Sequence, residues 1–109
     1  MTTDQLTNLL AHRVLGWTVT PDRFLQGDRR WLPRWRFRPT ENLMDAFQLL
    51  DAAAPDEYSI TGGKDCIFRV RVRLGESTGE STGKLKPLVI TCAIAQALRL
   101  EIASLAGPG

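Results

Sequence analysis

The sequence predicts an α+β domain in which a small, mostly antiparallel sheet of three to four strands packs with three helices. The chain has 109 residues, of which 43% are hydrophobic and 24% charged, the composition of one globular domain. Apolar residues recur at helical spacing in three separate segments. Residues 66–74 instead alternate apolar and basic side chains, as a strand with one buried face does. We therefore expect a single domain over residues 1–109.

The first helix is predicted over residues 3–15, capped by Thr3 and ended by Gly16 in a left-handed conformation. Residues 17–20 then alternate as a short strand does. Residues 35–37 are expected to add a short edge strand, because the prolines at positions 33 and 39 exclude a long central one.

A second helix is predicted to begin after a Thr40 cap and to end before Pro55. Its expected apolar stripe is formed by Leu43, Met44, Phe47 and Leu50. Two strands follow, over residues 58–61 and 66–74. The intervening Gly62-Gly63-Lys64-Asp65 predicts that they form a hairpin.

Residues 75–83 spell Gly-Glu-Ser-Thr-Gly-Glu-Ser-Thr-Gly, a tandem duplication that looks too polar and glycine-rich to pack. We expect a mobile loop over residues 75–84. It is no phosphate-binding loop, because its glycines are too close together and Leu85, rather than Ser or Thr, follows the lysine.

The last helix is predicted to run from Pro87 to about Ala103 and to be the most buried element. Its first residues, 88–92, also suit a strand, but the apolar pattern continues unbroken and favours a helix. We expect this helix to pack on the apolar face of the 66–74 strand. The predicted shared core contains Phe47, Phe68, Val70, Val72, Leu98 and Ile102.

Few side chains are available for catalysis or metal binding. The chain has one histidine and two cysteines, too few for a zinc site with four such ligands. His12 lies beside the first helix's apolar stripe and is read as a packing residue. We therefore expect no enzyme activity, no metal and no cofactor. Cys66 and Cys92 are expected to be buried free thiols.

The location expected for the chain is the cytoplasm of a bacterial host. The N-terminal residues are polar and acidic, unlike an export signal. The most apolar window, residues 88–95, is much shorter than the roughly 20 residues that cross a membrane. We therefore expect no membrane partner.

Residues 29–38, termed here the arginine–tryptophan segment, interleave arginines with aromatic residues. Its candidate contact residues are Arg29, Arg30, Trp31, Arg34, Trp35, Arg36 and Arg38. Such residues bind single-stranded nucleic acid and are enriched at protein interfaces. Alternatively, Trp31, Trp35 and Phe37 close the core while the arginines surround its edge.

A second set of arginines, Arg69, Arg71 and Arg73, is termed here the arginine ladder. It either extends the same basic surface or forms an ordinary solvated strand face. Charge is segregated along the chain, since residues 40–63 hold five acidic side chains and no basic one. Segregated charge can create patches of opposite sign that steer a partner, and the net charge of +2 is far from the strongly basic balance of a dedicated duplex-DNA binder.

The order of landmarks resembles the phage ABA sandwich domains, a family of small phage and prophage proteins. The matching stretches are Val14-Leu15-Gly16-Trp17, Phe37-Arg38-Pro39-Thr40 followed by Leu43, Ala46 and Phe47, and Thr91-Cys92-Ala93-Ile94-Ala95-Gln96-Ala97-Leu98. The resemblance implies an α-β-α arrangement and a phage origin. The family has no known activity, so the resemblance supplies no site residues.

These observations predict a non-enzymatic phage accessory protein that binds another protein, as small anti-defence inhibitors of host factors do. The alternative is a single-stranded nucleic-acid-binding protein. In that hypothesis Trp31 and Trp35 stack on bases, while Arg34, Arg36, Arg69 and Arg71 neutralise phosphates.

Overall fold

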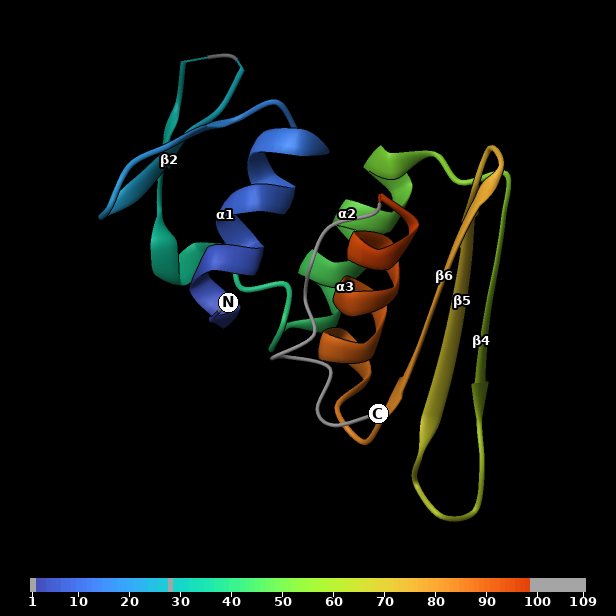
Figure 1. The fold of residues 1–109 in the computed structure, drawn as a ribbon. Coiled ribbons are helices and arrows are strands. Elements are labelled where there is room, and N and C mark those ends of the chain that lie inside the picture. The colour runs from blue at the N-terminus through green and yellow to red at the C-terminus, as the bar shows by residue number, and fades with distance from the viewer. Residues whose placement is uncertain (1, 28, 99–109) are drawn as a thin grey trace.

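The computed structural model describes residues 2–27 and 29–98. Two three-stranded antiparallel sheets, here named sheet A and sheet B, lie at the two sides of a helical layer (Figure 1). The helices are α1 (Thr3–Arg13), α2 (Leu43–Ala53) and α3 (Lys86–Ala97). Sheet A is formed by β1 (Thr18–Val19), β2 (Arg23–Leu25) and β3 (Trp31–Pro33). Sheet B is formed by β4 (Glu57–Gly62), β5 (Phe68–Leu74) and β6 (Ser77–Gly83).

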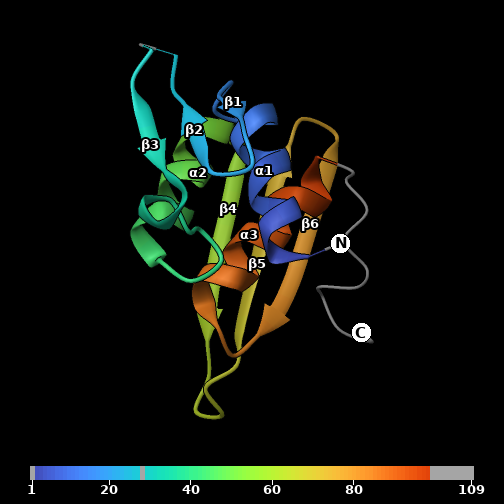
Figure 2. The same cartoon turned by 90° about the vertical axis from the view of Figure 1, so that its left-hand side faces the viewer.

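The α+β class is confirmed, but the α-β-α arrangement implied by the resemblance is not. The layers run from sheet A through α1 to α2 and α3, and then to sheet B (Figures 1 and 2). Within the described residues, helices cover sheet B from one side only. Its outer face is open, which is why it can carry a row of charged side chains.

Helix α1 begins at Thr3 as predicted and ends at Arg13 rather than at residue 15. The capping residues of α1 and α2 differ from the predicted ones, because other side chains reach the first free amides. Thr2, rather than Thr3, caps α1: its Oγ1 accepts from the Gln5 amide at 3.1 Å, and Gln5 Oε1 accepts from the Thr2 amide at 2.8 Å. Asn42, rather than Thr40, caps α2 by accepting from the Asp45 amide at 3.1 Å. The predicted left-handed Gly16 is confirmed, with φ of 72°.

The buried stripe of α2 also differs from the prediction. Ala46, Leu49 and Leu50 are fully buried, whereas Leu43 and Met44 are 36% and 81% exposed. The prediction gave weight to large apolar side chains, although small residues such as Ala46 allow two helices to pack closely. The first turn of α2 therefore presents Leu43 and Met44 to solvent.

Residues 34–36 form a short 3-10 helix, η1 (Arg34–Arg36), so the expected edge strand over residues 35–37 is wrong. The strand lies just before it, because β2 pairs with residues 31–33 and leaves residues 34–36 without a strand partner. The chain then returns to the helical layer, where buried Thr91 of α3 donates from Oγ1 to the Pro39 carbonyl at 2.9 Å.

The β4–β5 hairpin is confirmed, with Ser59 opposite Arg71 and Ile60 opposite Val70. Strand β5 begins at Phe68 rather than at Cys66, which has φ of 60° in the connecting loop. Cys66 is consequently exposed, contrary to the prediction, while Cys92 is buried. Both thiols are free.

The expected loop over residues 75–84 is wrong for residues 77–83, which form β6 and pair with β5. The duplication places Gly79 and Gly83 on the inner face of sheet B and Thr78, Glu80 and Thr82 on its outer face. A Cβ at Gly79 would lie 2.1 Å from the Ala93 carbonyl oxygen. Glycine therefore lets the strand lie directly against the backbone of α3.

Helix α3 packs on sheet B as predicted, and its start is helical. Its residues from Val89 to Ala95 are buried, as are Val70 and Val72 on β5. Phe47 and Leu98 are partly buried and pack against this core. Phe68 is partly buried at the start of β5, where Lys86 Nζ lies 5.5 Å from its ring centroid, so its predicted place in the core is wrong. The predicted end of this helix and Ile102 lie outside the described residues.

Candidate interaction surface

Sheet A turns one aromatic side chain of the arginine–tryptophan segment outward. In the β2–β3 register, Phe24 lies opposite Leu32, and Leu25 lies opposite Trp31. Alternation buries Phe24 completely and leaves Trp31 52% exposed on the outer face. The Arg23 guanidinium lies over the Trp31 ring, 5.1 Å from its centroid.

The opposite face of sheet A belongs to the core. Trp17, Phe24 and Phe37 contact one another with ring centroids 4.9 to 5.8 Å apart. Of the three aromatic residues in the arginine–tryptophan segment, Phe37 therefore closes the core, whereas Trp31 does not. The hypothesis that all three serve the core is correct for Phe37 only.

Trp35 is the most exposed aromatic side chain of the described residues. It lies on η1, is 70% exposed, and has the Arg36 guanidinium 5.3 Å from its ring centroid. A cavity of about 290 Å³ opens beside it and reaches the first turns of α1; its lining includes Trp35, Arg34, Asp4, Thr7 and Thr40. An aromatic side chain next to a cavity provides both an anchor and a place for a partner's side chain.

Arg34 holds the fold together and offers little to a partner. Its guanidinium donates to Asn8 Oδ1 on α1 and to the Thr20 carbonyl, and lies 5.0 Å from the Phe24 ring centroid. Arg38 is also engaged, with Nη2 2.6 Å from a Glu41 carboxylate oxygen. Arg34 thus fastens the segment to α1. At Arg38 it is the backbone amide, which donates to Asp45 Oδ2 at 2.9 Å, that fastens the segment to the first turn of α2.

The exposed charge around Trp31 is mainly basic. Arg29 and Arg30 are exposed in the β2–β3 turn, where Arg29 has φ of 65°. Asp22 lies 3.0 Å from the Arg23 guanidinium. Hydrogen bonds from Arg23 and Thr20 lower the pKa of Asp22 below its usual value. That carboxylate is thus already engaged within sheet A.

The arginine ladder lies on the open outer face of sheet B, as its alternation predicted. Arg69 Nε lies 3.6 Å from Glu80, and Arg73 Nε lies 3.7 Å from Glu57. Arg71 stands between Ser59 and Glu80 in the register. These exposed ion pairs contribute little to stability, because water and salt screen them.

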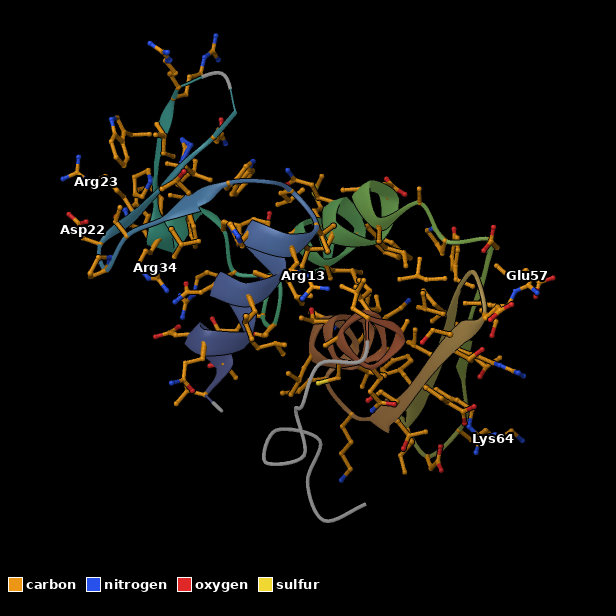
Figure 3. The ribbon with its side chains drawn as sticks, turned by 45° about the horizontal axis from the view of Figure 1, so that its top comes forward. Arg13, Asp22, Arg23, Arg34, Glu57 and Lys64 are labelled. Atoms are coloured by element: carbon orange, nitrogen blue, oxygen red, sulfur yellow. The ribbon has the colours of Figure 1, made fainter. Side chains whose placement is uncertain are left out.

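The structure separates the two sets of arginines. Arg23 and Arg34 lie at the sheet A end of the molecule, whereas Glu57 and Lys64 mark the sheet B end (Figure 3). The longest dimension of the chain is 41 Å, and the helical layer stands between the two sheets. Of the two interpretations of the ladder, the one in which it extends the surface around Trp31 and Trp35 is therefore wrong, and the one in which it forms a solvated strand face fits the exposure of all three arginines.

No protein-family model matches the sequence, and no curated protein matches it. The fold, however, resembles that of a phage protein. The crystal structure of a phage protein from Bacillus cereus ATCC 14579 superposes with a TM-score of 0.75. The match covers 94% of this chain and 92% of the other, at 16% sequence identity. At this identity the similarity establishes a shared fold and leaves the site to be argued from its own residues.

Sequence reasoning missed Arg23, which covers Trp31. The signal was present, because Arg23-Phe24-Leu25 and Trp31-Leu32-Pro33 alternate in the same way around a turn. This alternation, however, covers too few residues to distinguish a strand from a loop. The cavity beside Trp35 had no sequence signal, because residues from α1 and from positions 34–41 form it together.

The described residues show no other obvious centre of chemistry. Among residues 2–27 and 29–98, no cluster of three or more His, Cys, Asp or Glu side chains is placed to hold a metal ion. His12 is exposed, and its Nδ1 lies 3.3 Å from the Trp17 carbonyl oxygen. No helix in the same ranges is long and apolar enough to span a bilayer.

Proposed function

We propose that this chain is a non-enzymatic phage or prophage protein that acts in the bacterial cytoplasm by binding another protein through Trp31 and Trp35. The phage origin is supported by the fold shared with the Bacillus cereus phage protein. A host defence factor is the kind of target that a small phage protein of this type would inhibit.

The observation that carries the proposal is the exposure of two tryptophans on one end of the molecule, 52% for Trp31 and 70% for Trp35. Exposed tryptophans cost solubility, and tryptophan and arginine are the residues most enriched in interface hot spots. An arginine guanidinium lies over each of the two rings, that of Arg23 over Trp31 and that of Arg36 over Trp35. The cavity beside Trp35 provides a recess in which a side chain of the partner can bind.

The test is affinity capture from host lysate with the intact protein and with Trp31→Ala and Trp35→Ala. Truncating a hot-spot residue typically costs 2 kcal/mol or more, roughly a 30-fold loss of affinity. We expect each variant to reduce capture of the same partner, measured by quantitative mass spectrometry and then by calorimetry with the purified partner.

Leu85→Ala is the matched control. Leu85 is 62% exposed, but it precedes α3 and lies outside sheet A. This variant should capture the partner as the native protein does. Equal capture by all four proteins would contradict the assignment of the surface.

Single-stranded nucleic acid is the second candidate ligand, and the stacking of Arg23 on Trp31 and Arg36 on Trp35 favours it. Fewer arginines can contact phosphates than the sequence suggested, because Arg69 and Arg71 lie at the sheet B end of the molecule and Arg34 is hydrogen-bonded to α1. Arg29 and Arg36, both exposed, are the candidate phosphate contacts.

Titration of labelled oligonucleotides at two salt concentrations separates the two candidates. Phosphate binding by two arginines predicts that log K falls against log salt with a slope of about −1.4 for a single strand. Affinity that does not change with salt, or capture that survives nuclease treatment of the lysate, supports the protein partner instead.

A further inference from the structure

The two edge strands of sheet B, β6 and β4, differ in the contacts that they make with the rest of the chain. At the β6 edge, the Glu80 amide donates to Gln96 Oε1 of α3 at 3.2 Å, and α3 packs closely against the strand. At the β4 edge, no hydrogen bond from another segment of residues 2–27 and 29–98 satisfies the outward backbone groups. Strand β4 is therefore the more open of the two edges.

The sequence of β4 lacks the features that normally protect an edge. Residues 57–62 read Glu-Tyr-Ser-Ile-Thr-Gly, with no proline, no lysine and a single charge at the first position. Tyrosine, isoleucine and threonine instead favour strand pairing. An edge of this kind is a template for another strand.

The inner face of β4 is also incompletely covered. Helix α3 packs on β5 and β6. Tyr58, on the same face of β4, is 54% exposed, and Ile60 is only partly buried. A strand added beside β4 would meet these two side chains.

We propose that β4 pairs antiparallel with β4 of a second copy, about a two-fold axis through Ser59, and joins two sheets B into one sheet. In this register Ser59 faces Ser59 of the second copy, Tyr58 faces its Ile60, and Glu57 faces its Thr61. A two-fold axis normal to the sheet keeps both α3 helices on the same side of the sheet, each over its own β5 and β6.

The register is complementary on the inner face. Within one copy Tyr58 lies opposite Val72, and Ile60 lies opposite Val70. Pairing therefore creates continuous apolar rows of Val72 and Tyr58 with Ile60 and Val70 of the second copy. Aromatic and β-branched residues that face each other across strands stabilise a sheet by about 0.2–1 kcal/mol per pair, and two such pairs form.

The register is also tolerated by the charges of the outer face. No like charges oppose each other across the new pair of strands, since Glu57 faces a threonine. The two Arg71 residues are three strand spacings apart, about 14–15 Å. That exceeds the screening length of about 8 Å at physiological salt, so the two arginine ladders repel each other weakly.

Light scattering coupled to size-exclusion chromatography tests the association on the full chain. We expect a mass of twice the 12.2 kDa of one chain, falling to the single mass in Tyr58→Lys. Ile67→Lys is the matched control, because Ile67 is exposed in the β4–β5 loop and lies outside the strand. It should retain the double mass, and circular dichroism should show that both variants are folded.

Cross-linking tests the register independently. In a Cys66→Ser background, Ser59→Cys should form an intermolecular disulfide, because the two Ser59 residues are neighbours across the axis. Thr61→Cys in the same background should not, since the two copies of that residue would be about 14 Å apart along the strands.

A native chain that is monomeric at every concentration tested overturns the proposal, as does a dimer that resists Tyr58→Lys or cross-links through Thr61→Cys. The proposal uses β4 and leaves the tryptophans free. Trp31→Ala with Trp35→Ala should therefore keep the double mass, and the outcome here is separable from that of partner capture.

Discussion

Gly79 shows how the absence of one side chain decides where two elements lie. A Cβ at this position would come within 2.1 Å of the Ala93 carbonyl oxygen and 2.4 Å of the Ala97 nitrogen. Both atoms belong to the backbone of α3, so no rotamer change can relieve the clash. The helix and strand β6 would have to move apart.

We therefore expect Gly79→Ala to lower the free energy of unfolding by about 3 kcal/mol or more, measured by urea denaturation. Gly27→Ala is the control, because a Cβ there meets no atom within 4 Å. Its effect should stay within about 0.5 kcal/mol. Equal midpoints for the two variants would show that β6 does not press against α3.

The burial of a single residue, Cys92, also makes the stability of the fold depend on pH. Burial raises the pKa of the Cys92 thiol to about 11, because the thiolate is poorly solvated in the core. A raised folded pKa stabilises the fold below the unfolded pKa, which is about 8.5. That contribution is lost as pH rises towards 11.

We expect the native protein to lose stability above about pH 8.5 faster than Cys92→Ala does, measured as the difference between their thermal midpoints across pH 8 to about 11. The alanine variant itself leaves a small cavity and starts from a lower midpoint. If the thermal midpoints of the two proteins changed in parallel with pH, the thiol would ionise equally easily in the folded and unfolded states.

At the scale of the element, strand β5 carries the clearest division between inside and outside. Val70 and Val72 are fully buried under α3, whereas Arg69, Arg71 and Arg73 are exposed on the other face. The alternation of the sequence predicts this division, because successive side chains of a strand point to opposite faces.

Val70→Asp places an unpaired carboxylate in the core and should cost several kcal/mol, enough to unfold a small domain. Arg71→Asp lies on the open face opposite Ser59 and Glu80. It should cost no more than about 1 kcal/mol, including repulsion from Glu80. Thermal melts of the two variants measure both effects. Equally severe unfolding of both variants would mean that the outer face of sheet B is covered.

Strand β6 is the element on which composition misleads. Its residues, Ser-Thr-Gly-Glu-Ser-Thr-Gly, have the composition of a linker. Yet a four-residue period is also two strand periods, so both glycines fall on the face that meets α3 and the acidic residue falls on the outer one. The repeat can form this strand because its glycines lack side chains, and the space that side chains would fill is occupied by the backbone of α3.

For the whole molecule, the main consequence of the fold is the separation of its two ends. The arginines and tryptophans of sheet A and the arginine ladder of sheet B are separated by the helical layer (Figure 1). Sites more than about 10 Å apart that share no partner usually act independently.

We expect the effects of Trp35→Ala and Arg71→Ala on the free energy of unfolding to add within about 0.5 kcal/mol in the double variant. Urea denaturation of the native protein, the two single variants and the double variant measures this. Arg34→Ala with Asn8→Ala is the contrasting pair, because their side chains are hydrogen-bonded. A coupling between Trp35 and Arg71 as large as that of the contrasting pair would contradict the separation.

The sequence by itself determined the local features of this protein. The helical periods, the left-handed Gly16, the β4–β5 hairpin and the two faces of β5 all depend on residues a few positions apart, where backbone geometry dictates the pattern. For the same reason, the exposed arginine ladder could be predicted from the alternation of residues 68–74 alone.

Only the tertiary structure decided which aromatic residues the core would take and where the basic residues would gather. Phe37 is buried because Trp17 and Phe24 surround it, and β6 exists because Gly79 lies against Ala93. Arg34 turns inward because Asn8 lies on a neighbouring helix. Each of these contacts joins segments that lie far apart in the chain, so the burial of a residue depended on a partner that its own neighbourhood in the sequence does not specify.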